Sequence, residues 1–530
     1  MARRTPRLEA THEKTLTPLK ERCEQCGQPL WVAYHGHRTV TTLSGLWKLT
    51  LVVRQCIESS CPRFHQRYRP EEEGRWALPH GEFGLEVIAL IGQWRFRDHR
   101  SVPEMHQALL ARGIRIAQRS VTHLMQRYEE LVALRVSDHE RIKARLQKQG
   151  YVILAIDGLQ PDVGHEVLWV IRDCLSEEIL LARPLLSSTQ GDLTALLREV
   201  KDQLKQLAVP VKAVISDGQE TIGSAVAFVF PKVPHQLCQF HYLKDATKPL
   251  YEADQHAKTQ LKKQLRGVRP IERALEEHKT PENEAIRGYC LAVRASLTDD
   301  GRSPLQASGL RFYDRITQVS DSIARGKTKK RLPLALKQLQ QLLTKGMKAT
   351  SMLWSPLQSA YKLVHQAAQI LANPEQHTGT QVRERYLACV RQMQEQKAHV
   401  GPLGEAIEHF CHITDNFAAG LFECYDVEGL PRTNNDLEHC FGVARVHERR
   451  ATGRRGAIPG VVVRGSVRVI TAVVTRKQSF SAEELQPRDY QRWRDLRAHL
   501  QQCEETRRLQ FRFRKDPAAY LAALEAQLLT

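Results

Sequence analysis

The strongest indication of the fold class is the run Tyr151-Val-Ile-Leu-Ala-Ile-Asp-Gly158. Its apolar, partly β-branched residues predict a buried strand that ends at Asp157. Residues 166–172 and 178–185 predict two further strands. Because only short turns separate these three segments, we expect them to form an antiparallel meander.

A second buried strand, residues 211–215, ends at Ser216-Asp217-Gly218. Residues 192–207, before it, have the spacing of an amphipathic helix. A helix over 220–229 and a short strand at 235–238 are expected after it. Three meander strands, a helix and a β-α-β unit predict a mixed sheet with helices, and therefore an α/β fold.

Two aspartates, Asp157 and Asp217, stand at the ends of the two buried strands. Strand ends converge at the edge of a sheet, so distant carboxylates can meet there, and like charges held together need a cation. Oxygen ligands favour Mg²⁺, and two ions ~4 Å apart suit phosphodiester cleavage. A single aspartate at a strand end is more often a hydrogen-bonded turn residue, so a third carboxylate is needed.

The best candidate for the third carboxylate is Glu438, in the run Thr433-Asn-Asn-Asp-Leu-Glu438. This run is typical of a capped helix start, and Asp436 is the alternative ligand within it. Arg445 follows Glu438 two turns later on the same helix face, and Arg449 follows one turn further on. A carboxylate for metal and arginines for phosphate on one face suit a helix that acts on DNA.

Four motifs in this order are similar to those of a known enzyme family. They are Ala155-Ile-Asp-Gly158, Ile215-Ser-Asp-Gly218, Cys238-Gln-Phe-His241 and Thr433-Asn-Asn-Asp-Leu-Glu438. Residues 151 to about 470, about 60% of the chain, resemble the catalytic domain of DDE transposases with an RNase H-like fold. The resemblance is to the Mutator-like group and its bacterial insertion-sequence relatives, in which a long helical insertion before the glutamate is typical.

The resemblance implies a function and a set of site residues. It implies that Asp157, Asp217 and Glu438 bind two Mg²⁺ or Mn²⁺ ions, cleave the 3′ ends of the element and join them to target DNA. It also implies that four residues support the active site: Cys238, His241, Asn434 and Asn435. A second zinc site, in which Cys290 or Cys440 joins Cys238 and His241, is the alternative use of that pair.

Two cysteine pairs near the start of the chain predict a structural zinc site. Cys23 and Cys26 are separated by two residues, and Cys56 and Cys61 by four. This spacing, with strand-like segments at 30–34 and 47–53 between the pairs, predicts a zinc ribbon within residues 1–75. His65 is a possible replacement ligand, and four unrelated buried thiols are the simpler interpretation.

Residues 76–137 predict a helix-turn-helix domain. Ser101-Val-Pro-Glu104 has the pattern of a capping box, Gly113 ends that helix, and Ser120 is expected to cap the next one. The second helix would present polar side chains to a major groove: Arg119, Thr122, His123 and Gln126. A three-helix spacer that does not contact DNA is the alternative.

The rest of the chain completes a predicted multidomain organisation. The catalytic core is expected to occupy 138–245 and 426–480, with an all-helical insertion at 246–425 and a helical tail at 481–530. Within the core, residues 138–150 are expected to be a connector, and strand signals return at 460–474. In the insertion, Trp354 is expected to be a core residue rather than a platform for a DNA base.

The charge of the chain points to a polyanionic partner. The 530 residues include 78 Lys and Arg against 59 Asp and Glu, which gives a net charge of +19. The excess of positive charge is strongest between residues 441 and 515. In this segment we expect DNA contacts at Arg445, Arg449, Arg450, Arg454 and Arg455. Glu448 is expected to be solvated or to lie behind the metal-binding carboxylates. Double-stranded DNA is therefore the predicted partner. Because two transposon ends must be paired, a homodimer or higher oligomer is also expected.

Several other classes of protein are not supported by the sequence. No apolar run approaches the ~20 residues of a membrane span, and no secretory signal is expected. Twelve cysteines without an export signal suggest reduced thiols, and we expect a bacterial, cytoplasmic, nucleoid-associated protein. No phosphate-binding loop motif supports the use of ATP. Two rival functions remain: a non-enzymatic, transposase-derived DNA-binding regulator, and an RNase H-like nuclease without strand transfer.

Overall fold

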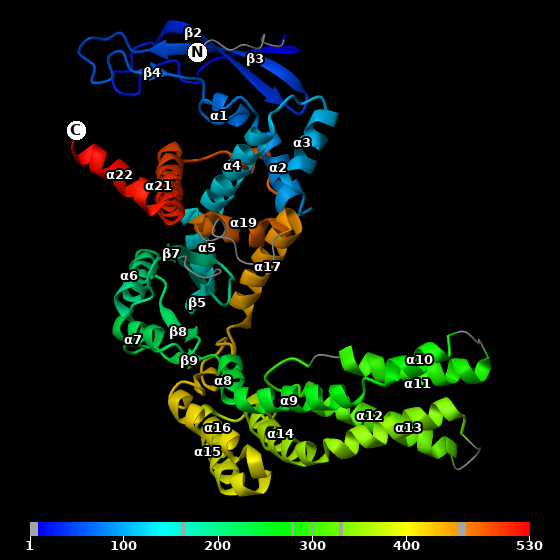
Figure 1. Cartoon of the computed structure of the whole chain (residues 1–530). Helices are drawn as coiled ribbons and strands as arrows, with labels where there is room; N and C mark the ends of the chain where they lie inside the picture. Colours follow the sequence, from blue (N-terminus) through cyan, green and yellow to red (C-terminus); the bar gives the residue numbers. More distant parts are fainter. Residues whose placement is uncertain are drawn as a thin grey trace. The chain divides into compact units, whose positions relative to one another are not determined.

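The computed structural model describes residues 9–160, 166–276, 280–298, 301–327, 332–453 and 463–529. The chain forms two compact units (Figure 1). Unit 1 comprises Met1–Pro210 and Asp436–Thr530, and unit 2 comprises Val211–Asn435. Both units combine strands with helices, so the predicted α/β class is confirmed at this level.

The first sheet of unit 1 contains the segment between the two cysteine pairs. Among the described residues it has four strands, with β1 parallel to β3 and both β2 and β4 antiparallel to β3. The strands are β1 (His12–Leu16), β2 (Trp31–Thr42), β3 (Gly45–Gln55) and β4 (Arg67–Tyr68). The strands expected at 30–34 and 47–53 are thus present as parts of β2 and β3. The apolar core of this sheet is small and centres on Leu16, Val40, Leu49 and Leu51.

Five helices follow in unit 1: α1 (Glu73–Trp76), α2 (Leu85–Phe96), α3 (Val102–Ala111), α4 (Gln118–Val136) and α5 (His139–Gln149). The capping box at the start of α3 is confirmed. The amide N–H of Glu104 donates to Oγ of Ser101 at 3.4 Å, and the amide N–H of Ser101 donates to Oε2 of Glu104 at 2.7 Å. Gly113 adopts a φ of 78°, which lets the chain turn from α3 toward α4.

Two expectations for this segment are wrong. α4 begins at Gln118 with Ala117 as its N-cap, so Ser120 lies inside the first turn. Residues 138–150 form α5 rather than a connector, because both helix ends are specified locally. Oδ1 of Asp138 accepts from the amide N–H of Arg141 at 3.0 Å, and Gly150 ends the helix with a φ of 90°.

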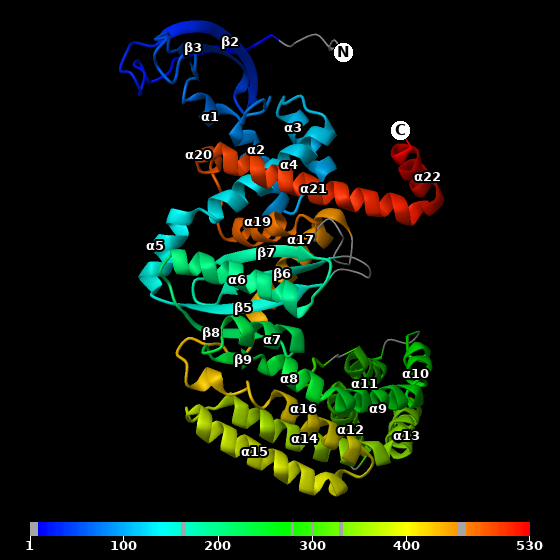
Figure 2. The same cartoon turned by 90° about the vertical axis from the view of Figure 1, so that its left-hand side faces the viewer.

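The predicted meander is confirmed in unit 1. β5 (Val152–Leu159) pairs antiparallel with β6 (Val167–Asp173), which pairs antiparallel with β7 (Ile179–Leu185). Within unit 1 the three strands lie in the order β7-β6-β5. α6 (Gln190–Gln206) covers one face of the meander (Figure 2). It buries an apolar stripe that includes Leu193, Leu197, Val200 and Leu204.

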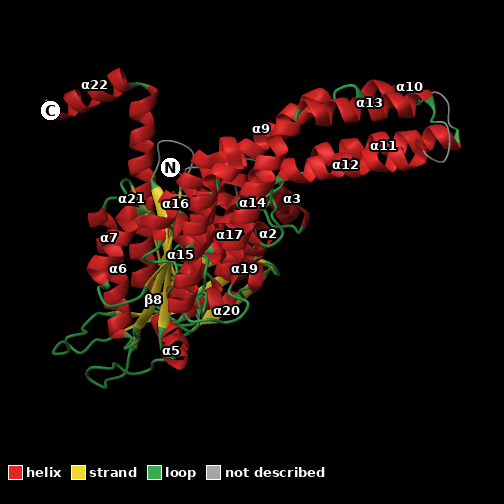
Figure 3. Ribbon diagram, turned by 90° about the horizontal axis from the view of Figure 1, so that it is seen from below, coloured by secondary structure: helices red, strands yellow, loops and turns green. Residues whose placement is uncertain are grey.

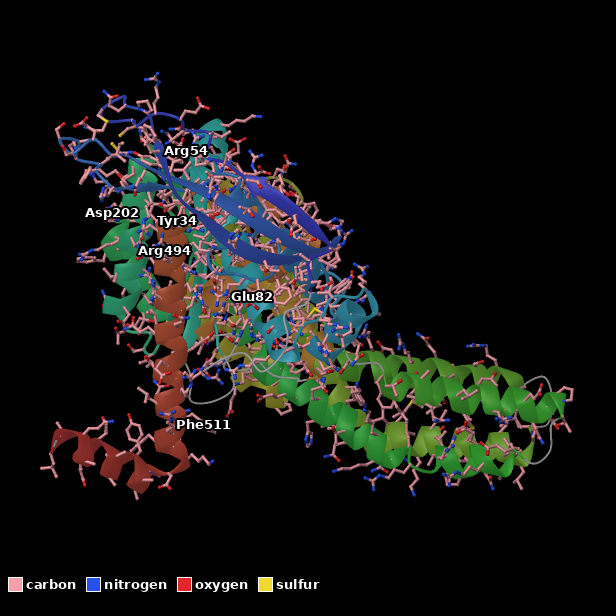
Figure 4. All side chains as sticks on the ribbon, turned by 90° about the horizontal axis from the view of Figure 1, so that it is seen from above. Tyr34, Arg54, Glu82, Asp202, Arg494 and Phe511 are labelled. Carbon is pink, nitrogen blue, oxygen red and sulfur yellow. The ribbon has the colours of Figure 1, made fainter. Side chains whose placement is uncertain are left out.

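The C-terminal part of unit 1 is helical. Its helices are α17 (Asn435–Thr452), α19 (Gly465–Lys477), α20 (Ala482–Leu485), α21 (Tyr490–Lys515) and α22 (Pro517–Leu528). The strand expected at 460–474 is wrong for the described residues from 465 onward, which form α19. Their β-branched side chains pack against α4 and β7, so tertiary contacts outweigh strand propensity. Phe511 on α21 is labelled in Figure 4 and is 65% exposed.

Unit 2 begins with β8 (Val211–Ser216), α7 (Glu220–Val229) and β9 (His235–Leu237), and β8 pairs parallel with β9. Helices follow: α8 (Gln239–Ala246), α9 (Lys248–Gln264), α10 (Val268–Ala274), α11 (Pro281–Thr298), α12 (Ser308–Lys327), α13 (Leu334–Ala349), α14 (Ser351–Ala372), α15 (Gly379–Glu395), η1 (Gln396–Leu403), α16 (Gly404–Phe417) and η2 (Glu423–Tyr425). Every element described between residues 246 and 425 is therefore helical.

The helices α10 to α13 extend together as a long bundle (Figure 3). Trp354 on α14 is buried, stacks on Tyr313 with ring centroids 4.6 Å apart, and donates to Oγ1 of Thr350 at 3.0 Å. It is a core residue, as expected. None of the described helices is long and apolar enough to cross a membrane.

Candidate functional site

The four N-terminal cysteines come together in unit 1. The Sγ atoms of Cys23, Cys26, Cys56 and Cys61 all lie within 4.8 Å of one another. The Cys23–Cys61 distance is 3.8 Å and the Cys26–Cys56 distance is 3.6 Å. Four sulfurs at ~2.3 Å from a tetrahedral zinc ion lie ~3.8 Å apart. The cluster could therefore bind a structural metal such as zinc.

Two tight turns bring the Sγ atoms of these four cysteines close together. In the first, the amide N–H of Cys23 donates to the carbonyl of Gln28 at 2.8 Å, and Gly27 takes a φ of 70° that suits glycine. In the second, the amide N–H of Cys61 donates to the carbonyl of Glu58 at 3.1 Å. His65 is exposed and does not belong to the cluster, which consists of the four thiols among the residues that the structure describes.

The environments of the four thiols differ. Backbone N–H groups of Cys26 and Gln25 lower the pKa of Cys23 to about 6, whereas burial raises the pKa of Cys56 to about 12. Cys23 therefore ionises more easily than an ordinary thiol, and Cys56 less easily. A group that displaces the proton is needed to convert Cys56 to a thiolate. A metal ion can displace this proton, because thiolate is the form of cysteine that a metal ion binds.

Asp157 and Asp217 each accept a local backbone hydrogen bond. Asp157 lies in β5, two residues before its end, and is 9% exposed. Its Oδ1 accepts from the amide N–H of Gly158 at 2.8 Å. Asp217 follows β8 directly in unit 2, where it is half-buried and its Oδ1 accepts from the amide N–H of Gln219 at 3.1 Å. Both contacts orient a carboxylate at or near a strand end.

Cys238 connects three segments of unit 2 that are far apart in the sequence. Its amide N–H donates to the carbonyl of Ser216 at 2.8 Å, one residue before Asp217. Its Sγ accepts from the amide N–H of Asn434 at 3.2 Å. The next residue, Gln239, donates its amide N–H to the carbonyl of Arg432 at 3.0 Å. The thiol thus serves as a hydrogen-bond acceptor that fixes the chain just before α17.

The remaining residues of this region have distinct environments. Asn434 is buried, and Asn435 is exposed at the first position of α17. His241 is half-buried on α8, with its ring edge-on to Phe240. Within unit 2, Cys238, His241 and Cys290 do not form a group of close metal ligands among the described residues. The alternative of a second zinc site formed with Cys290 is therefore not supported.

α17 has one buried face and one exposed face. Glu438 is half-buried, whereas Arg445, Arg449 and Arg450 are exposed. Arg454 and Arg455 lie outside the described residues. Of the two alternatives for Glu448, the solvated one is wrong, because Glu448 is buried and faces Arg95 at 3.8 Å and Arg468 at 3.6 Å. Its expected position behind the metal-binding carboxylates stays a prediction.

α4 presents only part of its predicted DNA-reading surface. Arg119 and His123 are exposed, while Thr122 and Gln126 are half-buried. The opposite face is buried and consists of Val121, Met125, Tyr128, Val132 and Val136. The exposed N-terminal turn of α4 is the part that could enter a groove.

A buried ion network holds α4 against the C-terminal helices of unit 1, and the sequence reading missed it. Glu129 is fully buried, and its carboxylate accepts from Nε of Arg464 at 2.8 Å and from Nε of Arg468 at 2.9 Å. Burial acts to raise the pKa of Glu129, but the two guanidinium groups outweigh it and hold this pKa below the usual range. The only available signal was the pair Glu129-Glu130 inside an otherwise apolar stretch of α4.

Comparisons with known proteins do not assign the chain. No protein-family model matches it, and no curated protein matches it either. The functional interpretation therefore depends on the thiol cluster, on the carboxylates and their supporting contacts, and on the basic helix faces.

Proposed function

We propose that the protein is a DNA transposase of the DDE type, which binds the terminal inverted repeats of its element, cleaves their 3′ ends and joins them to target DNA. The observation that carries the proposal is the position of Cys238. Its backbone contact with Ser216 and its thiol contact with Asn434 join the segment that leads to Asp217 with the segment that leads to Glu438. This junction supports the proposal, because the acidic residues of an RNase H-like core are far apart in the sequence and have to be brought together.

In this proposal Asp157, Asp217 and Glu438 hold two Mg²⁺ or Mn²⁺ ions. The donor set fits, since all three residues offer the carboxylate oxygens that these hard cations prefer. When bound, the ions would activate the attacking oxygen and stabilise the leaving oxygen. Cys238, His241, Asn434 and Asn435 act as positioning residues for the start of α17.

DNA binding is assigned to three surfaces of unit 1. The metal-bound form of the cysteine cluster would act as a zinc ribbon, and α3 and α4 would act as a helix-turn-helix with Arg119 and His123 toward the groove. Arg445 and Arg449 on α17 would contact phosphates, because guanidinium groups match phosphate geometry. The net charge of +19 supports a polyanionic partner.

The test uses the purified, zinc-loaded protein, labelled DNA carrying the ends that flank its own gene, and a plasmid target. Reactions run in Mg²⁺ and in EDTA, with Asp157→Ala and Glu438→Ala as inactive variants. Asp436→Ala is the matched control, since this exposed carboxylate lies in the same helical turn as Glu438. Cleavage and joining that both variants lose and the control keeps would support the proposal.

Other outcomes favour the two rival functions. Salt-sensitive binding to the ends without any cleavage would favour a DNA-binding regulator. Cleavage without a joined product would favour an RNase H-like nuclease. Loss of activity in Asp436→Ala together with full activity in Glu438→Ala would reassign the third ligand.

A further inference from the structure

One face of α17 is buried in unit 1, and the opposite face carries charged side chains. Residues that point into unit 1 are buried: Leu437, Cys440, Phe441, Ala444, His447, Glu448 and Ala451. Specific contacts hold this face, since Nη1 of Arg172 donates to Sγ of Cys440 at 3.4 Å, and His447 stacks on Phe96 with centroids 4.7 Å apart. The opposite face carries Glu438, Arg445 and Arg449, which follow one another at helical spacing.

Gly442 lies in the middle of this outward face, four residues after Glu438 and three before Arg445. Glycine in a helix interior is unfavourable relative to alanine. Packing explains two other helical glycines of unit 1, because a Cβ at Gly92 would overlap the ring of Tyr128 and one at Gly465 would overlap Leu168. Among the residues that the structure describes, no atom lies within 4 Å of a Cβ placed at Gly442. Neither packing nor backbone conformation therefore requires glycine at this position.

We propose that Gly442 lets the sugar-phosphate backbone of DNA approach α17 between Glu438 and Arg445. This inference rests on the proposed function and deepens it, since it names the surface along which the substrate strand runs. Glycine is the residue that allows a ligand to come close to a backbone. From Glu438 to Arg445 the helix rises ~10 Å, which corresponds to about three nucleotide steps of ~3.4 Å. The strand would thus pass Glu438, cross the bare helix at Gly442 and reach the arginines.

Substitution of Gly442 by alanine should have opposite effects on thermal stability and on DNA cleavage. Gly442→Ala should raise the melting temperature by about 1–3 °C, because alanine favours the helix and meets no clash. The same change should lower the rate of end cleavage at least tenfold, and Gly442→Leu should lower it further. Gly288 in α11 is the matched control, since it is also a helical glycine, and no described atom lies within 4 Å of a Cβ placed there. Gly288→Ala and Gly288→Leu should leave cleavage unchanged.

The measurements are thermal unfolding, end cleavage in Mg²⁺ and affinity for a labelled end duplex, with all five proteins side by side. Cleavage and affinity in both Gly442 variants equal to the wild type would overturn the inference. A wild type that binds DNA but does not cleave it would contradict the proposed transposase function. The DNA affinities of the Gly442 variants would then test the role of Gly442. A wild type that does not bind DNA would overturn both.

Discussion

The amide N–H of Asn434 donates to Sγ of Cys238 at 3.2 Å, across 196 residues of sequence. The thiol is fully buried in unit 2. Between the two residues lie the helices α8 to α16, and a second hydrogen bond, from the amide N–H of Gln239 to the carbonyl of Arg432, links the same two ends of this helical segment. These contacts hold the chain just before α17 against the segment just before α8.

Removing the thiol should therefore loosen the start of α17. We expect Cys238→Ala to lower the free energy of unfolding by about 1–3 kcal/mol, because the buried amide N–H of Asn434 loses this acceptor. Cys238→Ser should cost less, since a hydroxyl also accepts. Chemical denaturation measures both, with Cys389→Ala on α15 as the control for loss of a half-buried thiol. Equal stability of the serine and alanine variants would show that the contact contributes nothing.

Metal removal should unfold the N-terminal sheet of unit 1. The apolar core around Leu49 is small, and a four-thiolate site contributes folding free energy directly. The wild type should contain one zinc ion per chain by elemental analysis, and Cys26→Ser and Cys61→Ser should contain almost none. A strong chelator should make residues 9–70 sensitive to protease. Cys503→Ser, at a half-buried thiol on α21, is the control and should keep the full zinc content.

The network around Glu129 should make unit 1 sensitive to acid. Arg468 and Arg464 hold the pKa of this buried carboxyl below its usual range against the effect of burial. Its contribution is therefore present at neutral pH, above the unfolded pKa of ~4.3, and is lost as the pH falls through the lower folded value.

Glu129→Gln should lower the free energy of unfolding by about 3–5 kcal/mol at pH 7, because it removes the buried carboxylate that the guanidinium groups of Arg464 and Arg468 share. The difference from the wild type should shrink below pH 4 as the wild-type carboxyl becomes protonated. Denaturation of both proteins between pH 3 and pH 7 tests this, with the exposed Glu505→Gln on α21 as the control. A pH-independent difference would contradict the assigned cause.

The features that the sequence predicted correctly are those that a few neighbouring residues specify. The cysteine spacing, the capping box of Ser101 and Glu104, and the apolar runs that became β5, β6 and β8 are read from a few neighbouring residues, and the structure has them. α19 was missed because its valines favour a strand, whereas its contacts with α4 make it a helix. The pairing of Glu129 with Arg464 and the burial of Glu448 depend on residues that are hundreds of positions apart or lie on separate helices, so no local pattern could predict them.

The arginines of α17 should determine the salt dependence of DNA binding. Arg445 and Arg449 are exposed on the same face as Glu438, and each phosphate contact releases counterions. Each substitution by alanine should reduce the slope of log affinity against log salt by about 1, and should weaken binding to end DNA and to unrelated DNA alike. Arg391→Ala, at an exposed arginine on α15, should leave the slope unchanged. Fluorescence anisotropy over a salt series measures all three variants, and an unchanged slope in the α17 variants would remove this helix from the DNA-binding surface.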